Sequence, residues 1–397
     1  MDDAVPISEA DEQALLDSID RWLTRKVAPV AAKYEQADEY PTELVDDMCE
    51  MGLFGALIEP QYGGLGLPAT TYSRIVARIS EEWMSLTGFF NSHLMMALIV
   101  QKFGTQAQKE HWLPRFATGE LRGGLALTEP DAGTDLQGIR TVARRDGNVY
   151  RISGSKLWIT NSLEGSILAV LVKTDPDAEP RHRGMSMLIT PTRDPTTGEE
   201  CEGVSRGKKL PKLGYRGIDT GGISFDAAPV DARLGLVGGE EGKGFLMATG
   251  GLEIGRVNVA ARGVGIADGA LALATGYAQQ RKTFGKPICE HQAIQLKLAE
   301  MATRARAARL LTLDAAAAFD RGVRCDLEAG MAKYFASEAA LENSIESMRI
   351  HGAYGYSKEY DVERFYRDAP LTVIGEGTNE IQRVIIAKQW LKRNPIA

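Results

Sequence analysis

The spacing of hydrophobic residues near the start of the chain is typical of an amphipathic helix. Between Glu12 and Val27, apolar side chains recur every three or four residues, while Asp17, Asp20 and Arg21 occupy the opposite face. We therefore predict a helix over 12–27 that packs one face against the rest of the protein. The residues on that face are Leu15, Leu16, Ile19, Trp22 and Leu23.

Further helices are predicted along the first third of the chain. One starts at Pro41-Thr42 and ends at Met51-Gly52, because Pro suits the first helical position and Gly the position after the last. Helical spacing returns from Thr70 to about Gly104, and Lys109–Phe116 predicts one short additional turn. The first third of the chain is therefore expected to be helical.

One segment of this region, Trp83–Gln101, carries no formal charge. Its length approaches the ~20 residues that span a bilayer. Polar residues interrupt it, however, and they favour a helix buried inside the protein over a membrane span. These residues are Ser85, Thr87, Asn91, Ser92 and His93.

The pattern changes after Gly119, where β-branched residues and turn dipeptides replace helical spacing over roughly a hundred residues. Thr141–Arg144 and Val149–Ile152 flank Asp146-Gly147, which predicts a hairpin because Gly accepts the positive φ of a tight turn. Leu168–Val172 and Met185–Ile189 are predicted to be buried strands. A strand domain is therefore expected in the middle of the chain.

Helical spacing resumes at about Gly244, in long Ala-rich segments. Within one of these segments, four apolar residues share a face: Ile294, Leu298, Met301 and Ala305. The predicted fold class is α+β, mainly α. We predict an N-terminal helical domain over 1–120, a central β domain over 121–235 and a C-terminal helical domain over 236–397.

Composition narrows the possible functions of this folded chain. The 397 residues carry a net charge of −7, which disfavours a nucleic-acid partner because a polyanion would be repelled. The four cysteines include no CxxC pair and the five histidines show no metal-ligand spacing, so we expect neither disulfides nor a bound metal. The acidic start Met1-Asp2-Asp3 does not resemble a signal peptide, and we expect a cytoplasmic location.

Three glycine-containing segments could bring backbone N–H groups close to a phosphate: Ala132–Thr134, Arg281–Gly285 and Gly352–Gly355. None is a P-loop or a Rossmann fingerprint, and each by itself is typical of a plain turn. Their combination with neighbouring motifs is more specific. In chain order these are Leu127-Thr-Glu-Pro-Asp-Ala-Gly-Thr-Asp135, Trp158-Ile-Thr-Asn161, Arg281-Lys-Thr-Phe-Gly-Lys-Pro287 with His291-Gln292, and Ile374-Gly-Glu-Gly-Thr-Asn-Glu-Ile-Gln-Arg383.

This series of motifs resembles the acyl-CoA dehydrogenase family, and the resemblance extends over nearly the whole chain. It implies an N-terminal helical domain, a central β-barrel-like domain and a C-terminal four-helix bundle, in agreement with the order of patterns above. It also implies noncovalently bound FAD, an acyl-CoA substrate, a role in fatty acid β-oxidation, a homotetramer, and an electron-transfer flavoprotein as electron acceptor.

The reaction that the resemblance implies is α,β-dehydrogenation of the acyl-CoA thioester to a trans-2-enoyl-CoA. Glu376 occupies the position of the base that removes the α-proton, and flavin N5 would accept the β-hydride. Burial beside a neutral thioester would raise the pKa of this carboxyl and make it a better base. Taken alone, Glu376 could equally be a helix-start carboxylate near Thr378.

The resemblance also assigns the flavin contacts. Trp158 and Thr160 would cover the isoalloxazine ring, although Trp158 could instead fill the core. Arg281, Phe284 and Gln292 would reach the FAD of a neighbouring subunit. The complete set of expected cofactor residues is Leu125, Thr128, Gly133, Thr134, Trp158, Thr160, Arg281, Thr283, Phe284, His291, Gln292, Arg349, His351, Gly352, Thr378 and Glu380.

One expected cofactor segment, Arg349-Ile-His-Gly-Ala-Tyr-Gly355, matches the family turn imperfectly. Relatives commonly have Gln where Arg349 stands and Gly where Ala353 stands. His351 could touch the adenosine half of FAD or could be a packed core histidine.

For the substrate, the resemblance implies contacts with Thr134, Glu253, Arg256 and Gly377. Glu253 and Arg256 could also form an ordinary ion pair within one helix. One branch of the family, acting on isovaleryl-type substrates, places its base immediately before this arginine. Gly255 stands there in this chain, which leaves Glu376 as the expected base.

The sequence also suggests properties of the acyl pocket. The uncharged segment 83–101 offers no cation for a second carboxylate, which favours a monocarboxylic acyl-CoA. Gly375 could widen the pocket beside the base or could relieve backbone strain.

Two alternative functions remain open from the sequence. One is a flavin-dependent acyl-CoA oxidase or oxygenase that uses dioxygen. The other is a catalytically retired helical scaffold.

Overall fold

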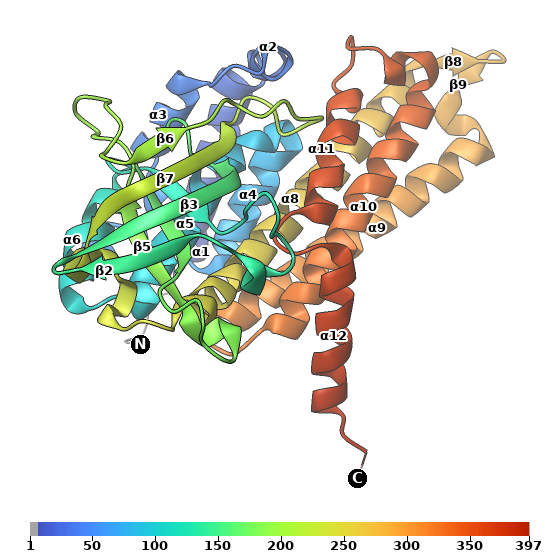
Figure 1. Cartoon of the computed structure of the whole chain (residues 1–397). Coiled ribbons are helices and arrows are strands. Elements are labelled where there is room, and N and C mark those ends of the chain that lie inside the picture. Colours follow the sequence, from blue (N-terminus) through green and yellow to red (C-terminus); the bar gives the residue numbers. More distant parts are fainter. Residues whose placement is uncertain (1–6, 397) are drawn as a thin grey trace.

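The computed structural model describes residues 7–396, with the side chains at 251 and 252 excepted. Helices at the start of the chain are followed by a sheet and then by a long helical bundle (Figure 1). The predicted order of helical, strand and helical regions is therefore confirmed.

The N-terminal region is helical because its apolar faces meet in one core. The predicted helix over 12–27 is confirmed, and its last five residues form a π-helical turn. The predicted short turn at 109–116 belongs to a longer helix, because Thr105 and Gln108 form a capping box that starts it earlier. The helices are α1 (Glu9–Trp22), α2 (Ala31–Ala37), α3 (Thr42–Glu50), α4 (Ala69–Trp83), α5 (Ser85–Phe103) and α6 (Gln106–Ala117), with η1 at Leu23–Val27 and short turns η2 (Leu53–Gly55) and η3 (Pro60–Tyr62).

The uncharged segment forms α5, and most of its side chains are buried in the main hydrophobic core, as predicted. Among the described helices, α8 (Gly244–Gln280) has the length and hydropathy of a membrane span, but 78% of its most apolar window lies buried inside the protein. Its apolar character is therefore explained by its place in the core.

The sheet contains seven strands in the order β1-β4-β2-β3-β7-β6, with β5 paired to β4. The predicted hairpin is confirmed: β2 and β3 pair antiparallel around Gly147, whose φ is 60°. The two predicted buried strands are β4 and β5. Strand bounds are β1 Gly123–Ala126, β2 Val142–Asp146, β3 Val149–Thr160, β4 Ile167–Lys173, β5 Met185–Pro191, β6 Val204–Arg206 and β7 Thr220–Asp231, with turns η4 (Leu136–Gly138) and η5 (Arg181–Gly184).

The C-terminal region packs around α8. Small residues allow close helix contacts: a Cβ at Gly263 would lie 2.6 Å from the Ala336 backbone in α10, and one at Gly265 would lie 2.3 Å from Ala77 in α4. Of the face predicted from the sequence, Met301 and Ala305 are buried and the other two residues are half-buried. The elements are α7 (Ala232–Gly235), η6 (Val237–Gly239), α8, β8 (Lys282–Thr283), β9 (Lys286–Pro287), η7 (Ile288–Glu290), α9 (Gln292–Asp320), α10 (Asp326–His351), η8 (Gly352–Tyr356), α11 (Val362–Ile374) and α12 (Asn379–Arg393).

Candidate active site

Glu376 lies in the short loop that joins α11 to α12. It has a positive φ of 54°, and the next residue, Gly377, has a φ of 92°. Positive φ is unfavourable for a residue with a side chain, so the surrounding structure must hold Glu376 in this conformation. The loop ends at Thr378, whose hydroxyl caps α12. Glu376 therefore precedes the cap and is not a helix-start carboxylate.

The Glu376 carboxylate is buried and only partly satisfied. Asn91 of α5 donates a hydrogen bond of 2.9 Å from Nδ2 to Oε1, whereas Oε2 has no hydrogen-bond partner among the described residues. Burial raises the pKa of this carboxyl, against the opposing effects of the Arg262 charge and the Asn91 hydrogen bond. A buried carboxylate oxygen with a raised pKa and no donor is well suited to accept a proton.

Gly255 of α8 makes room for this carboxylate. A Cβ at Gly255 would lie 2.0 Å from Glu376 Oε2 and 2.8 Å from the Met95 methyl group. Because these atoms cannot approach so closely, the base from the loop needs a glycine at this point of the helix. A side chain at position 255 would clash with this carboxylate, and Glu376 stays the predicted base.

Lys333 of α10 anchors the loop of Glu376, a role that the sequence did not predict. Its ammonium donates to the carbonyls of Val373 and Gly377, each at 2.9 Å, and to Asn379 Oδ1 at 2.8 Å. Burial lowers the pKa of Lys333 to about 8. No local motif marks this lysine, because its partners lie about 40 residues further along the chain.

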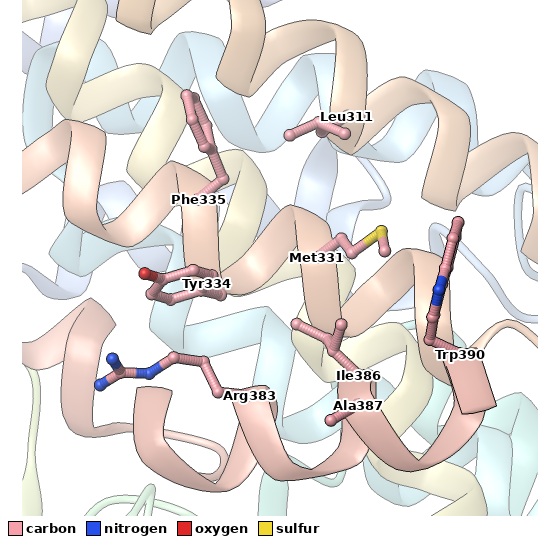
Figure 2. Close-up of a pocket in the computed structure, with 8 residues that line it drawn as sticks. All are labelled: Leu311, Met331, Tyr334, Phe335, Arg383, Ile386, Ala387 and Trp390. Atoms are coloured by element: carbon pink, nitrogen blue, oxygen red, sulfur yellow. The ribbon is translucent and has the colours of Figure 1, made fainter.

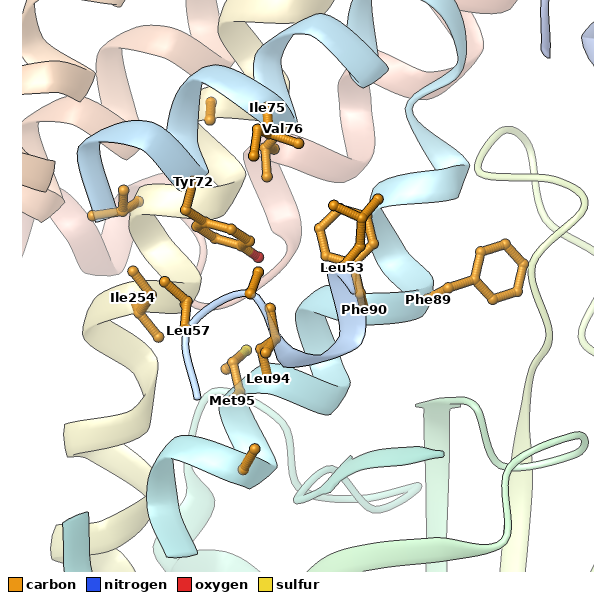
Figure 3. Packing of buried hydrophobic residues seen from close by; sticks show 14 of the residues in the cluster. Leu53, Leu57, Tyr72, Ile75, Val76, Phe89, Phe90, Leu94, Met95 and Ile254 are labelled. Carbon is orange, nitrogen blue, oxygen red and sulfur yellow. The ribbon is translucent and has the colours of Figure 1, made fainter. Parts of the chain in front are cut away.

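A chain of buried polar groups leads away from the base. Asn258 donates to Tyr72 Oη at 2.8 Å, and Tyr72 Oη donates to Asn91 Oδ1 at 3.4 Å. In Figure 3 the Tyr72 hydroxyl points into the space between α4, α5 and α8, toward Leu94 and Met95. No local motif predicts this arrangement, because its residues come from three separate helices.

Trp158 stands near the end of β3 and is not core filler. Its φ is 64° and its side chain is 56% exposed, at an irregularity in the pairing of β3 with β7. Asn161 fixes the end of the strand, because its amide donates to the carbonyls of Phe89 at 2.9 Å and Gly123 at 2.8 Å. The indole therefore presents a flat apolar surface, with Thr160 two residues further along the strand.

The loop that follows β1 carries Thr128, Gly133 and Thr134. Among the hydrogen bonds of the described residues, the N–H groups of Gly133 and Thr134 have no acceptor, and both residues are exposed. These donors are available to an anionic ligand. Leu125, also expected at the cofactor, is buried in β1 and donates its N–H to Ser92 Oγ at 3.2 Å.

A buried ion pair anchors the loop that follows β1, and the sequence did not predict this pair. Lys156 Nζ lies 2.8 Å from Glu129 Oε1 and also donates to the Leu127 carbonyl at 3.0 Å. Glu129 accepts further bonds from Arg140 and Thr141. Burial raises the Glu129 pKa, but Lys156 and these hydrogen bonds outweigh that effect and hold it below its usual range.

The residues expected to contact a neighbouring subunit's cofactor lie elsewhere. Arg281 and Gln292 are exposed, and Phe284 is 96% exposed with a φ of 51°. Thr283 Oγ1 and His291 Nε2 are hydrogen-bonded at 3.0 Å and shape this hairpin. Figure 1 shows β8 and β9 at the far end of the bundle, away from the sheet that carries Trp158. One chain therefore does not bring these residues together with Trp158.

In the segment around His351, one of the expected cofactor residues is buried and two are exposed. His351 is buried, with Nδ1 2.7 Å from the Ser347 carbonyl and its ring stacked 4.3 Å from Tyr277, which is the arrangement of a packed core histidine. Arg349 pairs with Glu346 and is exposed, as is Gly352. We therefore favour the core interpretation of His351.

Three further expected site residues, Glu253, Arg256 and Glu380, lie on helices α8 and α12. Arg256 pairs with Asp326 at 3.3 Å, and no ion pair within 4.0 Å joins it to Glu253 among the described residues. The ordinary intrahelical explanation therefore does not apply to this pair. Glu380 is exposed and pairs with Arg383. Gly375 has a φ of −65°, which any residue can adopt, so it does not relieve backbone strain.

Three family models match the chain in sequence: the N-terminal domain over residues 9–120, the middle domain over 124–228 and the C-terminal domain over 242–391 of acyl-CoA dehydrogenases. The chain belongs to the acyl-CoA dehydrogenase family. It is an oxidoreductase of this family, and the resemblance read from the motifs is confirmed.

Individual relatives agree with this assignment. The chain is 41% identical over 382 residues to an acyl-CoA dehydrogenase of Bacillus subtilis, covering 96% of this chain and 98% of the relative. The butyryl-CoA dehydrogenase structure from Megasphaera elsdenii matches with a TM-score of 0.91 and 34% identity, covering 98% of this chain and all of that one. A chain in a structure described as the electron transferring flavoprotein of Acidaminococcus fermentans matches with a TM-score of 0.92 and 33% identity, covering 98% and 100%.

Acyl-CoA dehydrogenases are FAD-dependent flavoproteins. Among the described residues, no group of three potential metal ligands comes together. The residues of this acyl-CoA dehydrogenase fit FAD: the exposed Trp158 indole suits a flat ring, and the free N–H groups of Gly133 and Thr134 suit a pyrophosphate. The hairpin with Arg281 and Phe284 lies away from these residues and does not join them in one chain.

Proposed function

We propose that this acyl-CoA dehydrogenase converts an acyl-CoA thioester to a trans-2-enoyl-CoA, with Glu376 as the base. The α-proton passes to the Glu376 carboxylate, and bound FAD supplies the acceptor for the hydride that leaves the β-carbon. One observation carries the proposal: Glu376 Oε2 is buried, has no hydrogen-bond donor among the described residues and belongs to a carboxyl with a raised pKa.

The backbone of the base supports this proposal. Among the described hydrogen bonds, the Glu376 N–H has no acceptor, and the positive φ of Glu376 sets its direction. An N–H held by a rigid loop can stabilise the charge that develops on a thioester oxygen. Lys333 provides that rigidity through its bonds on both sides of Glu376.

The substrate's CoA portion would lie near Glu253 and Arg256, one helical turn apart on α8, and near Thr134 and Gly377. The Arg256–Asp326 pair fixes the guanidinium at this end of the site. We retain these four residues as proposed substrate contacts.

A homotetramer is the assembly that we propose. The far placement of Arg281 and Phe284 supports at least a second copy, because these residues then complete the FAD site of a neighbour. An apolar groove of about 480 Å³ between α9, α10 and α12 supports a further contact (Figure 2). Its lining residues are Leu311, Met331, Tyr334, Phe335, Arg383, Ile386, Ala387 and Trp390.

Substitution of the base tests the proposal. The Glu376→Gln variant keeps the shape of the side chain but removes the proton acceptor, so acyl-CoA-dependent bleaching of the flavin without oxygen should fall ~10²–10⁴-fold. Glu359→Gln, at an exposed carboxyl, is the matched control and should leave the rate unchanged. Undiminished bleaching in Glu376→Gln would assign the base to another residue.

The electron acceptor is tested separately. We propose an electron-transfer flavoprotein and a role in β-oxidation, as the family resemblance implies, and a cytoplasmic location, as the acidic start of the chain and its scattered cysteines suggest. Oxygen consumption that matches substrate turnover would instead favour an oxidase. A protein that binds FAD but is bleached by no acyl-CoA would favour the scaffold alternative.

A further inference from the structure

Arg262 is a buried cation that the proposed reaction does not use. Arg262 lies on α8, seven residues after Gly255, and is only 5% exposed. Gly255, Asn258 and Arg262 are spaced three and four residues apart, so they share one face of the helix. Gly255 on that face contacts the Glu376 carboxylate, which places Arg262 about two turns further into the protein on the same side.

The partners of Arg262 do not neutralise its charge. Its Nη1 donates to Tyr215 Oη at 3.4 Å, and the guanidinium carbon lies 5.5 Å from the centre of the Tyr215 ring. Its Nε is buried without an acceptor, and no carboxylate of the described residues lies within 4.0 Å of it. A buried charge without a counter-charge is costly, and an anion at this place would remove that cost.

Several other buried cations of the described residues have a carboxylate partner, and Lys333, which has none, donates to three neutral oxygens instead. Arg256 pairs with Asp326, Lys156 pairs with Glu129, and Arg364 pairs with Asp361. Arg262 differs from them although it is equally inaccessible to bulk water. This contrast indicates that the partner of Arg262 comes from outside the chain.

The groups around Arg262 face the site of the base. Asn258, on the same face of α8, is fully buried, and its Oδ1 has no donor among the described residues. Its amide begins the polar chain through Tyr72 and Asn91 to Glu376. Among the nearby charges, that of Arg262 does most to lower the pKa of Glu376.

We propose that Arg262, together with Tyr215, binds a second carboxylate at the far end of the acyl group, so that the preferred substrate is a short dicarboxylyl-CoA. The distance supports a short acyl group. Seven residues of helix rise ~10 Å, and helical side chains lean back toward the N-terminus, which leaves a span on the order of four or five carbons.

This proposal rests on the proposed dehydrogenation and revises one expectation. The segment 83–101, now α5, contributes no cation, as the sequence showed, and this favoured a monocarboxylic acyl group. The cation comes from α8 instead. Periodicity alone could not reveal this, because Arg262 lies among apolar residues of a helix that is buried on nearly all sides.

Matched substrate pairs test the proposal on the purified FAD-bound enzyme. Butyryl-CoA is compared with succinyl-CoA, and pentanoyl-CoA with glutaryl-CoA, because the members of each pair differ only in a terminal methyl or carboxylate group. We expect the dicarboxylyl member of at least one pair to bleach the flavin with a kcat/KM at least ~10-fold higher, since a buried ion-pairing site rejects a partner that leaves it unpaired.

The Arg262→Gln variant separates carboxylate binding from an effect on the base. Loss of a carboxylate contact should lower kcat/KM for the dicarboxylyl substrate ~100-fold while changing the monocarboxylic substrate by less than ~10-fold. Arg262→Lys keeps the charge and should recover part of the preference. If Arg262→Gln does not retain FAD, Arg262→Lys and the wild-type pairs decide the outcome.

Two results would overturn the inference. One is a wild-type enzyme that uses monocarboxylic substrates as well as or better than both dicarboxylyl partners. The other is an equal loss for both substrate types in Arg262→Gln, because Arg262 would then act only through Glu376. In either case bleaching by any acyl-CoA leaves the proposed dehydrogenation standing, whereas bleaching by none refutes it.

Discussion

A single methyl group at Gly255 should displace the catalytic carboxylate without unfolding the enzyme. In the Gly255→Ala variant, the new Cβ would lie 2.0 Å from Glu376 Oε2, and ordinary van der Waals contact begins at 3.4 Å. The carboxylate must therefore move by about 1.4 Å. It can do so by rotating, because it is the end of a flexible side chain, but the 2.9 Å bond from Asn91 would be lost.

This displacement should slow the reaction much more than it destabilises the fold. A misplacement of ~1 Å can lower a rate ~10²-fold when the reacting groups must be aligned. We therefore expect kcat for acyl-CoA-dependent flavin reduction to fall ~10²-fold. Stability should change little, because Ala favours a helix interior over Gly by ~0.5–1 kcal/mol and partly offsets the crowding at the Met95 methyl group, 2.8 Å away.

The control is Gly276→Ala in the same helix, where an added Cβ meets no atom within 4 Å. Stopped-flow flavin reduction measures the rate, and urea unfolding of the holoenzyme measures stability. Gly276→Ala should reduce its flavin at the wild-type rate. Wild-type kcat in Gly255→Ala, or equal losses in both variants, would refute the assignment of Gly255 as the residue that makes room for the base.

Three further predictions concern the surroundings of the base and the cofactor loop. Burial raises the pKa of Glu376, so on acidification flavin reduction should begin to decline at a pH above the pKa of an ordinary glutamate. A pH profile of the rapid reduction rate with its midpoint at the ordinary glutamate pKa would contradict this. Since the native state then keeps a proton that the unfolded state releases, stability falls as pH rises through that window, and Glu376→Gln should unfold at higher urea concentration than wild type at neutral pH. Lys333→Met leaves three acceptors unpaired and should cost ~3–5 kcal/mol of stability with a lower kcat; unchanged unfolding would show that the loop needs no anchor. Glu129→Gln should weaken FAD retention on gel filtration, because Lys156 loses its counter-charge and the loop loses its anchor, whereas exposed Glu359→Gln should retain FAD fully.

Local patterns of residues were enough to predict several elements of this protein. Helical spacing predicted α1, α3 and the buried helix α5, and Asp146-Gly147 predicted the β2–β3 hairpin. These elements could be predicted because periodicity and turn chemistry act over a few residues. The motif order also indicated the family and the base Glu376.

Contacts between residues far apart in the chain became visible only in the folded structure. Gly255 approaches Glu376 across 121 positions of the chain (376 minus 255), and Lys333 anchors the loop from α10. His351 turned out to be packed against Tyr277, and Arg262 proved to be a buried cation beside the site of the base. No local pattern encodes these contacts, because burial and electrostatic pairing depend on how separate helices pack together in space.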